Sequence, residues 1–287
     1  MPTALSPLQI RDTCFQWGQQ TYLMGVLNVT PDSFSDGGQF NTVEAALQQA
    51  EAMVEAGVHM VDIGGQSTRP QAEDVSLEEE LERVVPVIQA IRQAGLTIPI
   101  SVDTTKAAVA QSAVIAGADL INDISGAIFD PDMLATVADL QVPIVLMHLR
   151  GTPKTMQQLT DYEDVVEAIT AFLQQRVAAA RAAGIASDRI ILDPGIGFAK
   201  TFDQNLEILR RLPQLRELGL PLLVGTSRKS FIGHLLNQPD PKQRLWGTAA
   251  TCCAAIRGGA DILRVHDVAE LRDVCRVADA IWRSDER

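Results

Sequence analysis

The chain alternates short apolar runs of strand length with longer segments in which apolar residues recur with a 3.6-residue period. The alternation begins at residue 22 and continues to the C-terminal region. This order is typical of βα units that build a parallel sheet. The expected strands span residues 22–28, 59–63, 98–103, 119–124, 143–148, 189–193, 221–226 and 261–266. Eight such units favour one closed (β/α)8 TIM barrel, in the α/β class, over a doubly wound sheet.

The helical segments carry their own start and stop signals. Apolar residues form one stripe over residues 43–54 and another over residues 77–91. Ser76 and Glu79 have the spacing of a capping box, which predicts the start of the second of these helices. Glycines a few residues before the next apolar run predict left-handed helix ends at Gly57, Gly95, Gly117, Gly184, Gly219 and Gly259.

The length of 287 residues allows one large barrel or two ordinary domains. Because the alternation is continuous, we expect a single barrel over residues 22–287. Residues 1–21 have weak periodicity and a polar turn, so we expect a short N-terminal β-hairpin or an irregular cap there. No GxGxxG motif follows the first strand and no P-loop motif occurs, which disfavours a nucleotide-binding sheet.

Composition excludes several classes of protein. Hydrophobic residues make up 46% and charged residues 21%, as in folded globular chains. The net charge of −12 argues against a nucleic-acid partner. No apolar run approaches the ~20 residues that cross a bilayer, so we expect no membrane partner and a cytoplasmic location. The four cysteines have no metal-ligand spacing and imply no disulfide.

Every expected strand ends in a polar or charged residue. These are, in chain order, Asn28, Asp62, Asp103, Asn122, His148, Asp193, the cluster Ser227, Arg228 and Lys229, and Arg264 with His266. Some could cap helices, which is the favoured interpretation for Asp62 and Asp119, and a role as core hydrogen-bonding residues stays open for His148 and Asn122. Burying unpaired polar groups costs about 2 kcal/mol or more each. Since barrel enzymes react at the C-terminal ends of their strands, the set as a whole predicts an active site.

The residue types indicate two kinds of substrate group. Arg264 and His266 are two residues apart on a strand, so their side chains point to one side. A local positive charge suited to a phosphate or diphosphate is expected from Arg69, Arg228, Lys229 and Arg264. Asp103, Asn122 and Asp193 instead suit a flat heterocycle with several N–H donors, because a carboxylate accepts two parallel hydrogen bonds.

Eight motifs follow one another at these strand ends: MGVLNVTPDSFSDGG, DIGGQSTRP, SVDTTK, INDISG, MHLRGTPKTMQ, DPGIGF, TSRKSFIG and RVHDVAE. Together they resemble the dihydropteroate synthase family over residues 24–270. The resemblance implies a pterin-binding TIM barrel that condenses 6-hydroxymethyl-7,8-dihydropterin diphosphate with para-aminobenzoate and releases diphosphate. It also implies Mg²⁺ as cofactor and a homodimer, for which residues 248–256 and the final helix are the expected face.

The resemblance assigns roles residue by residue. The pterin ring would be held by Asp103, Asn122, Asp193, Lys229 and Arg264. The diphosphate would contact Asn28, Thr68, Arg69 and His266, with Mg²⁺ between Asn28 and the phosphates. Phe198 and Ser227 would shape the aminobenzoate pocket. The residues expected to act in catalysis are Asn28, Asp36, Arg69, Lys229 and His266.

A dissociative mechanism suits this family, because the ring nitrogens can feed electron density to the methylene carbon before the arylamine attacks. The protein must then stabilise the diphosphate and keep water from the cation. We hypothesise that residues 34–36 fold over the site with residues 68–70, and that Asp36 stabilises the cation. Two departures from the family pattern, Gln66 in place of Glu and Gln71 in place of Gly, bear on loop kinetics more than on the reaction.

Two other functions are compatible with parts of the pattern. A methyltetrahydrofolate-binding methyltransferase would use the same Asp and Asn residues without diphosphate chemistry. A non-catalytic pterin-binding barrel would need no diphosphate-binding residues. A diphosphate leaving group, and so the synthase, is favoured by the cluster Ser227, Arg228 and Lys229, by Arg69, and by the pair Arg264 and His266.

Overall fold

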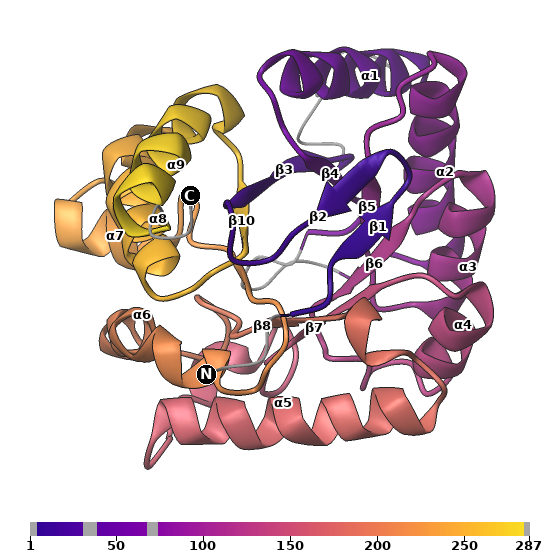
Figure 1. Cartoon of the computed structure of the whole chain (residues 1–287). Coiled ribbons are helices and arrows are strands. Elements are labelled where there is room, and N and C mark those ends of the chain that lie inside the picture. Colours follow the sequence, from indigo (N-terminus) through magenta and orange to yellow (C-terminus); the bar gives the residue numbers. More distant parts are fainter. Residues whose placement is uncertain (1–4, 31–38, 68–73, 284–287) are drawn as a thin grey trace.

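A computed structural model describes residues 5–30, 39–67 and 74–283. Its central element is a parallel sheet with the strand order β8-β7-β6-β5-β4-β3-β10-β9 (Figure 1). The strands are β3 (Tyr22–Asn28), β4 (Met60–Gly64), β5 (Ile100–Asp103), β6 (Leu120–Asp123), β7 (Ile144–Met147), β8 (Ile190–Asp193), β9 (Leu223–Val224) and β10 (Ile262–Val265). A bridge between Leu192 and Leu222 brings the two ends of the sheet together. The predicted (β/α)8 barrel and its eight strand positions are confirmed.

The helices surround this barrel (Figure 1). They are α1 (Gln39–Glu55), α2 (Leu77–Gln93), α3 (Ala107–Ala116), α4 (Met133–Leu140), α5 (Val165–Ala182), α6 (Phe202–Arg216), α7 (Ser230–Leu236), α8 (Leu245–Arg257) and α9 (Val268–Trp282). Short 3₁₀ helices η2 (Met156–Gln158), η3 (Ser187–Arg189) and η4 (Pro241–Arg244) lie in the connections.

The local signals for helix ends act largely as expected. The hydroxyl of Ser76 accepts a hydrogen bond from the Glu79 amide at 3.1 Å and caps α2. The Glu79 carboxylate instead pairs with Arg83, so the reciprocal half of the predicted capping box does not form at this helix. The six glycines predicted at helix ends all have positive φ, from +71° at Gly219 to +121° at Gly117.

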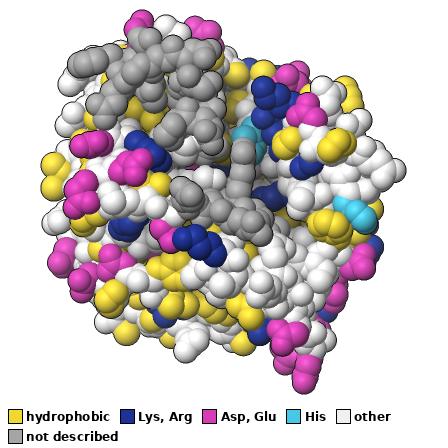
Figure 2. All heavy atoms as spheres, turned by 180° about the vertical axis from the view of Figure 1, so that it is seen from behind, with side chains coloured by type: hydrophobic (Ala, Val, Ile, Leu, Met, Phe, Trp, Pro, Cys, Tyr) yellow, Lys and Arg dark blue, Asp and Glu magenta, His cyan; other side chains and the backbone are white. Residues whose placement is uncertain are grey.

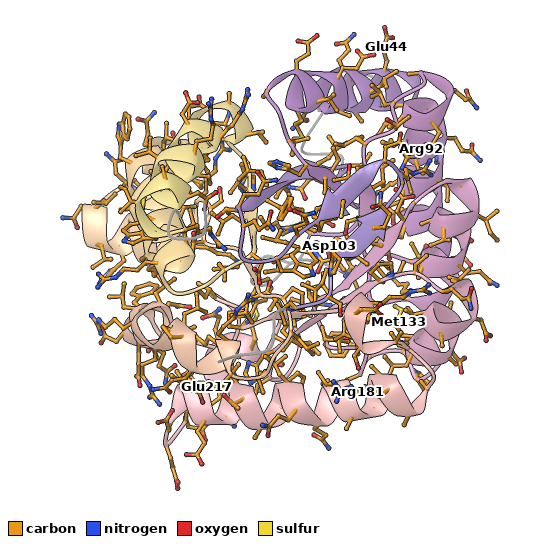
Figure 3. The ribbon with its side chains drawn as sticks, in the orientation of Figure 1. Glu44, Arg92, Asp103, Met133, Arg181 and Glu217 are labelled. Carbon is orange, nitrogen blue, oxygen red and sulfur yellow. The ribbon has the colours of Figure 1, made fainter. Side chains whose placement is uncertain are left out.

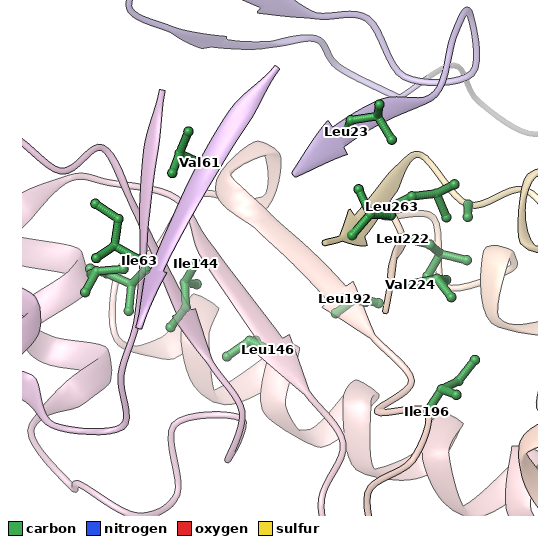
Figure 4. Close-up of a cluster of buried hydrophobic side chains, with 14 of the residues drawn as sticks. Leu23, Val61, Ile63, Ile144, Leu146, Leu192, Ile196, Leu222, Val224 and Leu263 are labelled. Atoms are coloured by element: carbon green, nitrogen blue, oxygen red, sulfur yellow. The ribbon is translucent and has the colours of Figure 1, made fainter. Parts of the chain in front are cut away.

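Alternation along the strands divides the core into two parts. Side chains that point outward, among them Val61, Ile144 and Leu263, pack against the helices (Figure 4). Side chains that point inward, such as Met24, Met60 and Ile191, fill the barrel near the N-terminal ends of the strands. Each such buried aliphatic side chain contributes about 1.5–3 kcal/mol to folding.

A two-stranded hairpin closes the N-terminal end of the barrel. It consists of antiparallel β1 (Leu8–Ile10) and β2 (Thr13–Phe15), which lie across the barrel in Figure 1. The Phe15 and Tyr22 rings are 4.8 Å apart between centroids. The hairpin expected at the N-terminus is therefore present, and its apolar residues complete the inner core.

Asp119 lies at the hairpin end of the barrel and does not cap a helix, so the favoured interpretation is wrong for it. Its carboxylate accepts hydrogen bonds from Arg11 at 2.6 Å, Arg92 at 2.7 Å and the Ile100 amide at 2.8 Å. Because Arg11 lies just after β1, this cluster ties the hairpin to the barrel. Over the part of the chain that the structure describes, no helix has the length and apolar character to span a membrane.

Candidate active site

Inward-facing positions become polar above the aliphatic layer of the barrel. On β4, Met60 is followed two residues later by Asp62, and on β6, Leu120 is followed by Asn122. Asp103 and Asp193 end β5 and β8 in the same way, and Figure 3 shows Asp103 near the barrel centre. All four side chains are buried. The C-terminal mouth of the barrel therefore has a polar floor.

Arg264, on β10, links its own strand to β4 and β5 in this floor. Its Nε donates to Asp62 Oδ2 at 2.6 Å, and its Nη2 donates to Asp103 Oδ2 at 2.9 Å. Asn122 Nδ2 donates to the same oxygen of Asp62 at 3.1 Å. Burial alone would lower the pKa of Arg264, but the charges of Asp62 and Asp103 outweigh it and raise the pKa. The guanidinium is thus fixed and permanently charged.

Asp62 does not cap a helix, and that favoured interpretation is wrong. Its side chain faces the barrel interior and is fully buried. Oδ1 has no hydrogen-bond partner among the described residues. The signal that could have placed it is the two-residue alternation from Met60.

Burial raises the pKa of the two carboxylates that face the mouth. The pKa of Asp103 is raised to about 7, because burial and the neighbouring Asp62 outweigh the Arg264 charge. The pKa of Asp193 is raised to about 6 by burial, which the Gly195 amide, Lys229, Lys200 and Arg264 oppose. The Gly195 amide donates to Asp193 Oδ1 at 2.7 Å, and within the described parts of the chain Oδ2 has no such donor. Asp193 can therefore accept hydrogen bonds from a ligand.

Lys229 and Phe198 form one wall of the mouth. Lys229 Nζ lies 4.1 Å from the centroid of the Phe198 ring, which is a cation–π contact. Burial and the Arg264 charge lower the pKa of Lys229 to about 8. Gly197 allows this arrangement, because a Cβ atom there would lie 2.9 Å from Lys229 Cδ.

Ser227, which follows β9, meets His266, which follows β10. The Ser227 hydroxyl accepts from the His266 amide at 3.2 Å and lies 3.0 Å from His266 Nδ1. Burial and the charges of Arg264 and Arg228 lower the pKa of His266 to about 3, so the ring is neutral. If the hydroxyl donates to Nδ1, the ring proton is on Nε2, which can then donate to an anion.

Arg228, which was expected to add positive charge at the mouth, is paired with a carboxylate. Its Nε donates to Asp267 Oδ2 at 3.1 Å, and its Nη2 pairs with the other carboxylate oxygen. Its φ is +60°, and Arg244 donates to its carbonyl at 2.9 Å. Arg228 therefore braces the turn that presents Lys229. Figure 2 shows Lys, Arg and His side chains near the centre of this face of the molecule.

Gln66, which follows β4, lies beside an ion pair whose carboxylate is buried. Lys106 pairs with Glu80, which is 1% exposed, and also donates to Gln66 Oε1 at 3.1 Å. Gln66, one of the two departures from the family pattern, therefore keeps a hydrogen bond without adding a second negative charge. A cavity of about 220 Å³ adjoins Asp103 here and is lined also by Lys106 and Phe129.

Asn28 ends β3 at the rim of the mouth. A Cβ atom on Gly64 would lie 3.7 Å from its Oδ1, so the amide oxygen lies over the end of β4. The described ranges hold no group of three His, Cys, Asp or Glu residues that could bind a metal ion. A single amide oxygen still suits Mg²⁺, which takes few protein ligands when substrate phosphates supply the others.

His148 serves as a core hydrogen-bonding residue, the alternative left open for it. Its Nδ1 lies 3.0 Å from Lys200 Nζ, and its ring contacts Phe172 edge-on. The sequence interpretation missed Lys200 and assigned the wrong role to Asp62. For Lys200 the signal was a lysine two residues after the DPGIGF motif. Outside the described residues lie Phe34, Ser35, Asp36, Thr68, Arg69, Pro70 and Gln71.

Comparisons with known proteins show the family to which the chain belongs. The family described as "Pterin binding enzyme" matches residues 24–266. The dihydropteroate synthase of Synechocystis sp. is 61% identical over 277 residues, 96% of each chain. Two solved dihydropteroate synthases are similar: that of Yersinia pestis with a sulfonamide drug complex (TM-score 0.90, 45% identity, 96% and 99% coverage) and that of Xanthomonas albilineans with 7,8-dihydropteroate (TM-score 0.86, 43% identity, 96% and 98% coverage). The chain belongs to the pterin-binding enzyme family, among the dihydropteroate synthases.

Proposed function

We propose that the mouth of this barrel binds 6-hydroxymethyl-7,8-dihydropterin diphosphate and para-aminobenzoate and joins them as dihydropteroate. The observation that carries the proposal is the floor around Arg264, where Asp103, Asn122 and Asp193 converge. A carboxylate accepts two N–H groups from an aminopyrimidinone edge, and a fixed guanidinium stacks on a flat ring. Asp193 therefore receives the amino and ring N–H groups, and Asn122 and Lys229 complete the edge.

The diphosphate leaves from the side of Asn28 and His266. The neutral His266 ring donates from Nε2, and Asn28 is the residue that would hold Mg²⁺ at this end. When bound, Mg²⁺ stabilises the charge that develops on the departing diphosphate. Thr68 and Arg69 are assigned to this end through the family motif.

Bond breaking precedes bond formation in the proposed reaction. The methylene C–O bond breaks, the electron pair leaves with diphosphate, and the cation is stabilised by the ring nitrogens. The aminobenzoate nitrogen then forms the C–N bond and loses a proton. Phe198 and Ser227 form the wall that positions the arylamine, and Asp36 stabilises the cation electrostatically.

One assay separates the three candidate functions. Protein, pterin diphosphate and Mg²⁺ are mixed, and diphosphate release is measured before and after para-aminobenzoate is added. The synthase predicts release that rises with the amine, together with dihydropteroate detected by mass. A binding protein would take up pterin without release, and a methyltransferase would transfer a methyl group instead; either result overturns the proposal.

We further propose that the enzyme is a homodimer. On the outer surface of α8 and α9, Trp246 is 80%, Val277 62% and Ile281 61% exposed, which is unusual for large apolar residues. Much of the apolar segment 248–256 packs inward instead, so the expected face moves to the outer side of these helices. Val277→Asp combined with Ile281→Asp should give monomers in light scattering. Ile115→Asp, on α3, is the matched control, and an unchanged mass of the double variant would refute this face.

The expected cytoplasmic location stays part of the proposal. All four cysteines are free thiols, and Cys252 and Cys275 are buried. Free buried thiols suit a reducing compartment.

A further inference from the structure

Lys200 is a buried charge at the mouth that the proposed reaction does not use. Its side chain is 3% exposed. Nζ donates to the Phe198 carbonyl at 2.8 Å and lies 3.0 Å from His148 Nδ1. No carboxylate of the described residues lies within ion-pair distance of it. A buried ammonium without an ion pair is costly, so its contacts call for a function.

One contact of Lys200 is to the loop between Asp193 and α6, and the other is to His148, on which this loop rests. The Phe198 amide donates to the Gly195 carbonyl at 3.1 Å, which forms a tight turn. A Cβ atom on Gly195 would lie 2.1 Å from the His148 carbonyl oxygen, so the loop backbone rests directly on His148. The His148 amide donates to the Asp193 carbonyl at 3.0 Å. Lys200 thus joins the far end of the loop to the strand end beside Asp193.

The protonation states fit this arrangement. Burial and the Lys200 charge lower the pKa of His148 to about 2, so Nδ1 is free to accept a hydrogen bond. The charged groups that face Asp193 are Lys229, Lys200 and Arg264, and those that face Lys200 are Asp193 and Lys229. Burial lowers the pKa of Lys200 to about 7, and Asp193 opposes this shift. Lys200 and Asp193 therefore each favour the charged form of the other.

We propose that Lys200 is a positioning residue: it clamps the Phe198 carbonyl to His148, so that the Phe198 ring stays against Lys229 and a positive charge stays near Asp193. The inference rests on the proposed function, in which Phe198 borders the arylamine and Asp193 binds the pterin. Loss of the clamp releases the aromatic wall. Loss of the charge makes Asp193 harder to ionise.

The test compares Lys200→Met with Lys200→Arg, using Lys242→Met on exposed η4 as the matched control. For Lys200→Met we expect the KM for para-aminobenzoate to rise about tenfold, since small misplacements near reacting groups are costly. The acid limb of pterin binding should move up by about one pH unit, because removing a cation raises the pKa of Asp193. Lys200→Arg should restore much of the pH profile, and Lys242→Met should match the wild type.

An unchanged KM and pH profile in folded Lys200→Met would overturn the proposal, as would identical losses in Lys200→Met and Lys200→Arg. If Lys200→Met does not fold, His148→Leu removes one acceptor and leaves the ammonium in place. It should raise the KM for para-aminobenzoate in the same direction, and an unchanged KM there counts against the clamp. Failure of the proposed function is distinguishable, because the wild type itself would then form no dihydropteroate.

Discussion

At the scale of single residues, the mouth combines buried carboxylates with cations that do not fully neutralise them. Asp62 and Asp103 share Arg264, whereas Asp193 has the Gly195 amide and more distant lysines. A carboxylate with an oxygen facing the mouth is poised to accept N–H groups, because ligand binding supplies the donors that burial removed. This explains why the polar floor is tolerated in a barrel with an otherwise aliphatic interior.

Asp193 should give pterin binding a defined pH dependence. Its pKa is raised to about 6, mainly by burial, so the accepting carboxylate form is lost below that pH. Calorimetric affinity for a pterin ligand should increase from pH 5 to pH 8. Asp193→Asn should bind about 10–100-fold more weakly at pH 8, because charged hydrogen bonds are lost. If the affinity for the pterin depends equally on pH in the wild type and in Asp193→Asn, the pH dependence belongs to another group.

The same shift predicts the sign of a stability effect. The pKa of Asp193 in the folded protein is above its value near 3.9 in the unfolded chain. Its contribution to the free energy of unfolding is therefore fully present below about pH 4 and is lost as pH rises through about 6. The melting temperature of the unliganded wild type should therefore fall, relative to Asp193→Asn, between pH 4 and pH 7. If the melting temperatures of the wild type and Asp193→Asn change equally with pH across this range, the assignment to Asp193 is contradicted.

At the scale of elements, the loop from β8 to α6 organises one side of the site. Thr201 and Gln204 form a two-way capping box at the start of α6, and Asn205 Oδ1 accepts from the Gly197 amide at 2.6 Å. These contacts fix Gly197 beneath Lys229. The loop is thus held by the following helix and by Lys200 at once.

Gly197→Ala tests the close approach to Lys229. Alanine would have to adopt φ +86° and would place its Cβ 2.9 Å from Lys229 Cδ. We expect the KM for pterin diphosphate to rise about tenfold, because displaced binding groups lose contacts. Gly95→Ala is the matched control, since Gly95 has φ +79° and open space around its Cβ position. Equal loss of stability with no change in KM in either variant would show that only backbone strain matters.

Elements and individual contacts differ in how far sequence predicts them. Periodicity and helix-end glycines place the strands, because these signals are local. The partners of Arg228 and Arg264 are not local: Asp267 is 39 residues from Arg228, and Asp62 is 202 residues from Arg264. Barrel closure brings them together, so the strand-end set was predictable while its ion pairs were not. The burial of Lys200 likewise depends on how the loop packs on His148.

At the scale of the whole molecule, the two ends of the barrel have separate tasks. Phe15, at the end of β2, and Trp17, just after it, complete the inner core at the N-terminal end. The polar groups lie at the opposite end, and aliphatic side chains separate the two. We therefore expect substitutions at the hairpin end to change stability without changing the chemistry at the mouth.

Phe15→Ala tests this separation. Phe15 is 1% exposed and packs on Tyr22, so its truncation should cost about 3–5 kcal/mol of unfolding free energy. Urea unfolding should show the loss, while the KM for both substrates in the remaining folded enzyme should equal that of the wild type. A changed KM would mean that the hairpin end communicates with the mouth.

The most direct test of the account is a single-turnover experiment with enzyme in excess over pterin diphosphate and with Mg²⁺ present. Diphosphate and dihydropteroate are measured over the same time course. The account predicts that both appear in equal amounts when para-aminobenzoate is present, and that Asp193→Asn slows both. Diphosphate release without dihydropteroate in the presence of the amine, or no release at all, would contradict it.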